Sequence, residues 1–197
     1  MIAAVPSIGR VTRCSTRGFV GALRLPEPEL PTFGSYCQAE AQQGQSRVVG
    51  LIYDISIEDD ELARQLASSD HLSPEQLADS QVNRQIPVEY SALAVGYIDG
   101  GGIHQCLPPQ PPLTLASVYP LVDDELRMFT AHLDFLPLIL SAPNLPADDL
   151  LAAAVHTAAG ARPEHERRAY RLLAAQECAR LLARDLTRLD NLLRLMG

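Results

Sequence analysis

The spacing of apolar residues changes along this sequence, and the change falls at one proline-rich stretch. Before it, apolar residues alternate with polar ones, as they do in strands; after residue 120 they recur three and four residues apart, as they do in helices. The stretch itself, LPPQPPLTL at residues 107–115, places four prolines within five positions. The sequence therefore predicts an α+β fold with an N-terminal strand region and a C-terminal helical region.

Six strands are predicted in the first half of the chain. They cover residues 7–15, 18–25, 34–41, 47–57, 88–98 and 103–107. The Asp-Gly-Gly-Gly run at 99–102 suits a hairpin turn, because glycine tolerates positive φ, and no helix start follows it as a phosphate-binding loop would require. Short strands with glycine-rich turns predict a small closed or partly closed β-barrel, with a β-sandwich as the main rival.

A helical insertion is expected between the fourth and fifth strands. Ser56 is the expected N-cap of a helix over residues 56–70, and a second helix starts at Ser73, where Gln76 completes a capping box. The acids at 58–61 point in different directions on a helix, so we expect a solvated helix start there rather than a metal site.

Three helices are predicted after residue 120. The first covers residues 122–140, with Asp123 as its cap and Pro137 as a kink or an end. The second covers residues 145–160, and the third runs from about Pro163 nearly to the C-terminus. Together these elements predict a C-terminal helical segment that follows the small β-barrel.

The last helix carries an apolar stripe with the spacing of a coiled-coil seam. The stripe consists of Leu172, Ala175, Ala179, Leu182, Leu186, Leu189, Leu193 and Met196. It either packs on the two preceding helices as a three-helix bundle or pairs with another chain, which would make a homo-oligomer. Four leucines off the stripe widen the apolar face and favour the bundle: Leu173, Leu181, Leu192 and Leu195.

The predicted organisation is a β-barrel domain at 1–107, a proline-rich connector at 108–120 and a helical domain at 121–197. Prolines in series favour a stiff polyproline II stretch, whereas a flexible linker would be rich in Gly or Ser. A ligand for a proline-reading module carries a basic residue beside its prolines, and the nearest arginine here is Arg127. We therefore interpret the connector as a semi-rigid strut.

The charged residues exclude several functions. All 16 basic residues are arginine, so a P-loop lysine, a Schiff-base lysine and a lysine general base are all excluded. The net charge is −8, and residues 51–125 carry two arginines against thirteen acids. Such an acidic middle repels phosphate backbones, which argues against direct binding of nucleic acid.

No residue is predicted to be catalytic, to bind a cofactor or to hold a metal. The chain has none of the common nucleotide-binding, metalloprotease or nucleophile-elbow motifs, and its five histidines are dispersed. A catalytic triad assembles in space, so a hydrolase whose site forms only in the fold stays open as the alternative. The absence of a signal-like start and of a membrane-length apolar run predicts a cytoplasmic protein.

Several segments of the strand half resemble a known module. SIGRV, TFGSYCQA, RVVGLIYDI and ALAVGYI, with glycines at 9, 34, 50 and 96, resemble the small N-terminal β-barrel of HerA-type hexameric ATPases, called the HAS-barrel. The resemblance spans roughly residues 5–115. In that family a RecA-like motor with a phosphate-binding loop follows the barrel, whereas a helical segment without lysine follows it here.

The resemblance implies the role of the barrel without that of the motor. In HerA-type proteins the barrel helps to dock a nuclease of the NurA kind during DNA-end processing. By resemblance this chain is expected to be a non-catalytic adaptor with a protein partner, either such an ATPase or such a nuclease. Candidate docking residues are Val48, Val49 and Leu51 in the fourth strand, and Leu182, Leu186, Leu189 and Leu193 in the last helix.

Overall fold

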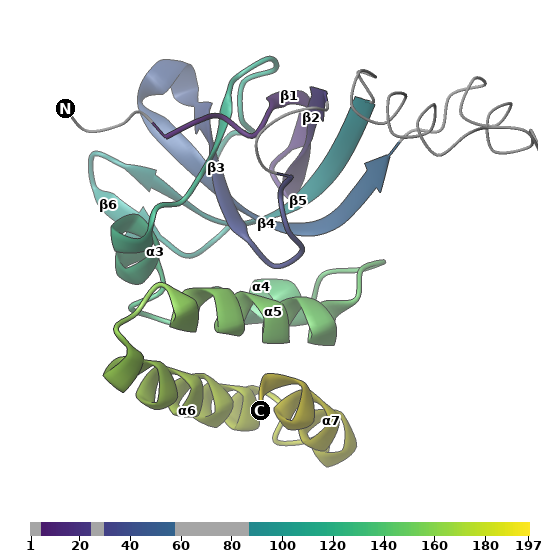
Figure 1. Cartoon of the computed structure of the whole chain (residues 1–197), viewed down its shortest axis with the longest axis vertical. Coiled ribbons are helices and arrows are strands. Elements are labelled where there is room, and N and C mark those ends of the chain that lie inside the picture. Colours follow the sequence, from purple (N-terminus) through teal and green to yellow (C-terminus); the bar gives the residue numbers. More distant parts are fainter. Residues whose placement is uncertain (1–4, 25–29, 58–86) are drawn as a thin grey trace, which may run out of the picture.

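The protein is built as a curled antiparallel sheet above two layers of helices (Figure 1). This architecture comes from a computed structural model that describes residues 5–24, 30–57 and 87–197. The α+β class is confirmed, and within the described residues the strands precede the α-helices. The helical insertion predicted between the fourth and fifth strands falls mostly on residues 58–86, which lie outside the described residues.

Within the described residues the sheet has seven strands. They are β1 (Arg10–Ser15), β2 (Gly18–Arg24), β3 (Tyr36–Ala41), β4 (Ser46–Ile57), β5 (Pro87–Asp99), β6 (Gly102–His104) and β7 (Val118–Pro120). The first six overlap the six predicted strands, and β6 ends three residues before the predicted end at residue 107. Ser56 belongs to β4, opposite Glu89 of β5, so it does not cap a helix as expected.

The strand order is β1-β2-β5-β4-β3-β7, with β6 paired to β5, and every pairing is antiparallel. The register of β4 against β5 shifts twice, between Val49 and Gly50 and between Ile52 and Asp54. Such bulges bend a strand and increase its twist. The two longest strands therefore curl the sheet around its inner face.

The two edges of the curled sheet are joined by backbone hydrogen bonds. Ile8 N donates to Val118 O at 2.8 Å, and Val118 N donates to Gly9 O at 2.9 Å. Val11 N donates to Ala116 O at 2.9 Å as well. Residues 116–118 thus pair with residues 8–11 at the other edge of the sheet. Backbone groups that an open edge would leave unpaired form hydrogen bonds here.

β7 was not predicted, because it has only three residues and lies at the end of the stretch interpreted as a connector. The proline run before it also contacts the sheet. Pro112 forms a bridge with Ala41, and Leu113 N donates to Glu40 O at 2.8 Å. The run is therefore packed down on the sheet, while the division of the chain into separate domains stays a prediction.

Two apolar clusters hold these layers together. The inner cluster lies inside the curl of the sheet and includes Val11, Phe19, Val48, Ile52 and Tyr90, all buried. The outer cluster joins the other face of the sheet to the helices. Its members from the sheet are Tyr36, Val49, Leu51 and Val95, and they pack with helical residues that include Phe129, Phe135, Leu136, Leu150 and Leu151.

The helices are α3 (Asp123–Phe129), α4 (Leu136–Leu140), α5 (Ala147–Gly160), α6 (Glu164–Leu181) and α7 (Leu186–Met196). Four details correct the predictions. The helix predicted over residues 122–140 is two helices, α3 and α4, separated at residues 130–135. Val122, not Asp123, is the N-cap of α3. Pro137 lies in the first turn of α4 instead of ending a helix, because that turn needs no backbone donor. The expected last helix is two helices, separated at residues 182–185.

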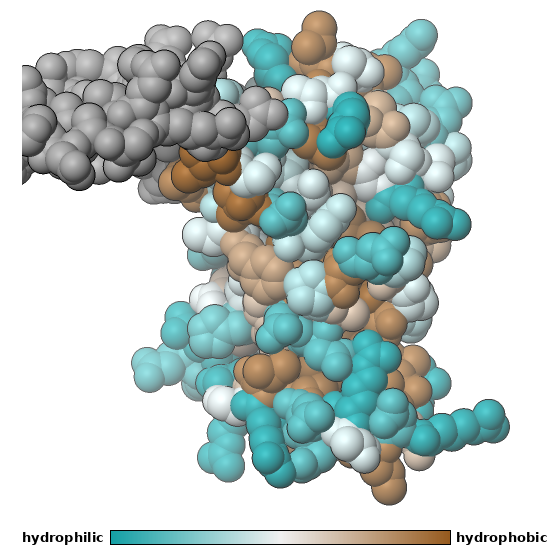
Figure 2. All heavy atoms as spheres, turned by 90° about the vertical axis from the view of Figure 1, so that its right-hand side faces the viewer, coloured by the Kyte–Doolittle hydropathy of each residue, from teal (hydrophilic) through white to brown (hydrophobic). Residues whose placement is uncertain are grey.

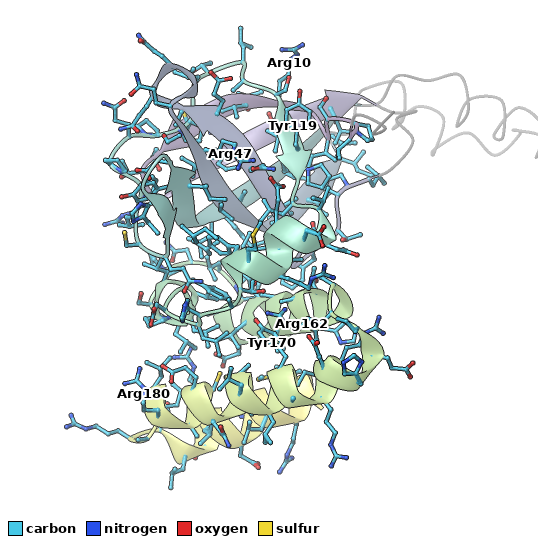
Figure 3. The ribbon with its side chains drawn as sticks, turned by 90° about the vertical axis from the view of Figure 1, so that its left-hand side faces the viewer. Arg10, Arg47, Tyr119, Arg162, Tyr170 and Arg180 are labelled. Carbon is cyan, nitrogen blue, oxygen red and sulfur yellow. The ribbon has the colours of Figure 1, made fainter. Side chains whose placement is uncertain are left out.

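One buried arginine ties the helical layers together. Arg162 donates to Ala158 O at 2.6 Å and to the carbonyl and hydroxyl oxygens of Thr130, each at 3.0 Å. Its guanidinium carbon lies 3.6 Å from the ring centroid of Tyr170, and Figure 3 shows the two side chains together between α5 and α6. Burial raises the pKa of the Tyr170 phenol, so the ring stays neutral beside the cation.

No helix among the described residues is long and apolar enough to cross a membrane.

Candidate functional site

The three docking candidates of β4 are core residues. Val48 lies in the inner cluster, while Val49 and Leu51 lie in the outer one, and all three side chains are fully buried. A partner could reach them only if the sheet or its helical cover opened. The apolar pattern that indicated these residues reflects burial on both faces of the strand, and their role in docking stays a prediction.

The four candidates of the last helix are separated by the break between α6 and α7. α6 ends at Leu181, and the Asp185 side chain then caps α7 by accepting a hydrogen bond from Arg188 N at 3.0 Å. Leu182 follows the end of α6 and is buried. The predicted seam is thus interrupted, and only its last part lies on α7.

Three of the predicted candidates remain together on α7. Leu186, Leu189 and Leu193, the α7 ridge, are spaced three and four residues apart and so share one side of the helix. Leu186 is 70% exposed and Leu193 is 38% exposed, while Leu189 is partly buried against the core. Figure 2 shows apolar side chains exposed between polar ones at the helical end of the molecule.

Contacts of neighbouring residues hold α7 in place. Leu192 and Met196 are buried in the outer cluster, and Met196 continues the spacing of the ridge three residues after Leu193. Arg188 pairs with Asp148 of α5, where Nη2 lies 2.7 Å from Oδ1, and this hydrogen bond raises the pKa of the arginine. Because α7 is anchored through these residues, the ridge is presented on a fixed helix.

An open groove of about 710 Å³ lies between the sheet and the connection from α4 to α5. Residues of one wall come from the β1–β2 hairpin and from β5, and residues of the other wall from α4 and the loop after it. The lining residues are Arg13, Cys14, Ser15, Arg17, Gly18, Phe19, Val20, Tyr53, Ala92, Leu93, Ala94, Leu107, Leu138, Ser141, Ala142, Pro143 and Leu145. Sequence reasoning missed the groove because these segments are far apart in the chain.

The hairpin wall of the groove is fixed by close backbone contacts. Ala94 N donates to Arg17 O at 2.9 Å, and Arg17 N donates to Ser15 Oγ at 3.2 Å. A Cβ at Gly18 would lie 2.2 Å from Ala92 O, so only glycine fits between the hairpin and β5. Arg17 is thus held at a defined place beside the groove.

A second polar cluster lies on the β5–β6 hairpin. Asp99 Oδ1 accepts from Gly101 N at 2.7 Å and lies 3.0 Å from His104 Nε2. The Tyr97 ring stacks on the imidazole with centroids 4.5 Å apart. The Gly101 amide, and then His104, hold the pKa of Asp99 below its ordinary value. The cluster stabilises the hairpin turn.

The histidines of the polar clusters have few polar partners among the described residues. No serine, threonine or cysteine described here hydrogen-bonds to His104. A smaller depression of about 310 Å³ contains His132, Asp134 and Glu177, where Arg180 lowers the pKa of the Glu177 carboxyl. No group of three potential ligands among the described residues is placed to hold a metal ion.

No protein-family model and no curated protein sequence matches this chain. The HAS-barrel resemblance therefore rests on the sequence segments alone.

Proposed function

We propose that this chain is a non-catalytic adaptor that docks on a HerA-type ATPase or a NurA-type nuclease in DNA processing. The observation that carries the proposal is the α7 ridge, where three predicted docking leucines share one side of a fixed helix. The curled sheet would be the HAS-barrel of the adaptor, closed by the hydrogen bonds between its edges. The barrel then supports the helices, and α7 supplies the surface that docks on the ATPase or nuclease.

The exposure of the ridge favours a partner on energetic grounds. Leu186 leaves 70% of its surface in water, although Leu192 and Met196 of the same helix are buried. Covering an exposed leucine contributes roughly 1.5–3 kcal/mol to association. An exposed ridge on a rigid helix is also the shape that a helix-binding groove accepts.

The test is affinity purification from the native host with mass spectrometry, using three forms of the protein. The ridge variant carries Leu186→Asp and Leu193→Asp, and the control carries Thr187→Asp and Asn191→Asp, which place two charges at exposed positions of α7 off the ridge. We expect a HerA-like or NurA-like protein with the wild type and the control but not with the ridge variant. Its recovery with all three forms, or with none, would contradict the proposal.

A second copy of the chain is the other occupant that the sequence pattern allows. In that case light scattering would give twice the 21.4 kDa mass of the chain, and the ridge variant would return the mass to that of the monomer. A dimer through the ridge that excludes any further partner would replace the adaptor proposal by self-association.

The hydrolase alternative stays a prediction without an observation that favours it. It would require a nucleophile within hydrogen-bond reach of a base, as in a serine or cysteine hydrolase. The groove of about 710 Å³ is lined by two arginines and by apolar and small residues, with no histidine, aspartate or glutamate.

A further inference from the structure

We propose that the groove between the β1–β2 hairpin and the α4–α5 connection binds an acidic segment of a protein partner that carries an apolar anchor residue. The groove is separate from the α7 ridge, because it is formed by other elements of the fold. Binding in the groove and docking through α7 are therefore independent, and either can occur without the other.

The interior of the groove is apolar. Phe19 and Ala92 line the groove from the inner cluster, and Leu93, which lines it as well, is partly buried against the outer cluster. Leu138 and Leu145 belong to the opposite wall. A volume of about 710 Å³ falls within the range of pockets that take small molecules or a few side chains, so one or two apolar side chains of a peptide would fit.

The rim of the groove is positively charged. Arg13 and Arg17 line the groove and are exposed, and neither forms an ion pair with another described residue. No aspartate or glutamate is found among the described residues that line it. A carboxylate in the groove would therefore meet two arginines without displacing an internal partner that the structure describes.

The charge of the hairpin differs sharply from that of the rest of the chain. Residues 7–24 contain four arginines and no acid, a charge of +4, while the remainder of the chain carries −12, which together give −8. The basic hairpin attracts an acidic segment at short range. The acidic remainder repels a long polyanion, so the charge distribution favours a short acidic peptide over a nucleic acid.

The hairpin is also arranged before any ligand binds. The Arg17 backbone is fixed through Ala94 N and Ser15 Oγ, and Gly18 lies directly against β5. Little backbone entropy is then lost when a ligand binds, and this preorganisation favours affinity. Leu107, at 46% exposure, adds an apolar contact that a peptide side chain would cover.

The test is fluorescence polarisation of labelled synthetic peptides with the full-length chain. The probe has Phe-Leu flanked on each side by Asp-Glu; one control peptide has the same acidic flanks around Ser-Ser, and another has Phe-Leu between Lys-Arg pairs. We expect the probe to bind with at least about tenfold higher affinity than either control. Raising the salt concentration should weaken its binding, because the arginines are exposed to solvent.

Matched variants locate the binding. Arg13→Glu with Arg17→Glu, and separately Leu107→Gln, should each weaken binding of the probe by about tenfold or more. Two controls should bind as the wild type does: Arg168→Glu with Arg184→Glu, which reverses two exposed charges outside the groove, and the α7 ridge variant. Circular dichroism of each variant establishes that it is folded.

Four results would overturn the inference. The first is no binding of the probe up to about 1 mM, and the second is equal binding of all three peptides. The third is tighter binding of a single-stranded oligonucleotide than of the probe with the same dependence on Arg13 and Arg17, which would assign the groove to nucleic acid. Loss of probe binding in the α7 ridge variant would show that the groove is not a separate site.

Discussion

The curled sheet and the α6–α7 pair differ in how far their apolar side chains are exposed to solvent. In the sheet, strand residues such as Val48, Val49 and Leu51 are fully buried, because one face lies inside the curl and the other is covered by helices. In the helix pair, Leu172 is 59% exposed and Leu186 is 70% exposed. The same apolar signal in the sequence therefore means core in one region and surface in the other.

The difference teaches where a partner can bind. A strand buried on both faces has used its apolar surface within the chain, whereas a terminal helix packed on only one side has not. The sheet is thus expected to tolerate few changes, and the outer sides of α6 and α7 to tolerate many. The following variants test that contrast, beginning with the largest expected effect.

Gly96→Ala tests how tightly the sheet is packed against α3. A Cβ at this position would lie 2.4 Å from His104 O and 2.9 Å from the Phe129 ring, so the backbone of β6 or the core must move. We expect a loss of about 3 kcal/mol in the free energy of unfolding, measured with urea. Gly100→Ala, where no atom lies within 4 Å, is the matched control and should cost far less. Equal stability of both variants would mean that the sheet is not packed as described.

Arg162→Met tests the tie between the helical layers. The change leaves the Thr130 carbonyl and hydroxyl without their guanidinium donor and removes the cation from the Tyr170 ring. We expect a loss of about 2 kcal/mol, measured by thermal or urea unfolding. Arg168→Met, at an exposed position of α6, should leave stability nearly unchanged. If the two variants unfold alike, the buried arginine does not hold α6 on α5.

Pro109→Gly with Pro111→Gly tests whether the proline run is stiff. Both prolines are exposed, so their replacement removes little packing and acts mainly by giving the unfolded chain more freedom. We expect a loss of about 1 kcal/mol in total. Unchanged stability together with unchanged partner binding would show that the run is not a strut.

Asp99→Asn tests how much the Asp99 carboxylate stabilises the turn of the β5–β6 hairpin. Because the pKa of Asp99 is lower in the folded chain than the ordinary value of 3.8, the carboxylate stabilises the fold above that pH. This contribution is lost as the pH falls through the lower, folded pKa. The difference in Tm between wild type and Asp99→Asn should therefore shrink below pH 3.8. A difference that stays constant through the acid range would assign the effect to something other than the charge.

Much of the sheet could be predicted from the sequence, and less of the helical region. Strand bounds followed from alternation and from glycine turns, except for the three-residue β7. The break after α6 could not be predicted, because Leu182, Leu186 and Leu189 keep the seam spacing straight through it. Only the cap formed by Asp185 marks the start of α7.

Of the two candidate sites, the α7 ridge could be predicted in part from the sequence and the groove could not. Leu186, Leu189 and Leu193 were predicted from their spacing, but the spacing does not say which side of a helix its neighbours cover. The groove depends on contacts between segments around residues 13–20, 92–94 and 138–145, which the order of the chain does not bring together. Its one signal in the sequence is the cluster of arginines without acids at residues 7–24.

The most direct test of the proposed function is calorimetric titration of the purified ATPase or nuclease partner with wild type, the ridge variant and the off-ridge control. If the α7 ridge is the docking surface, Leu186→Asp with Leu193→Asp should raise Kd by about 100-fold, while Thr187→Asp with Asn191→Asp should change it by less than about twofold. The same Kd for all three forms would contradict docking through α7.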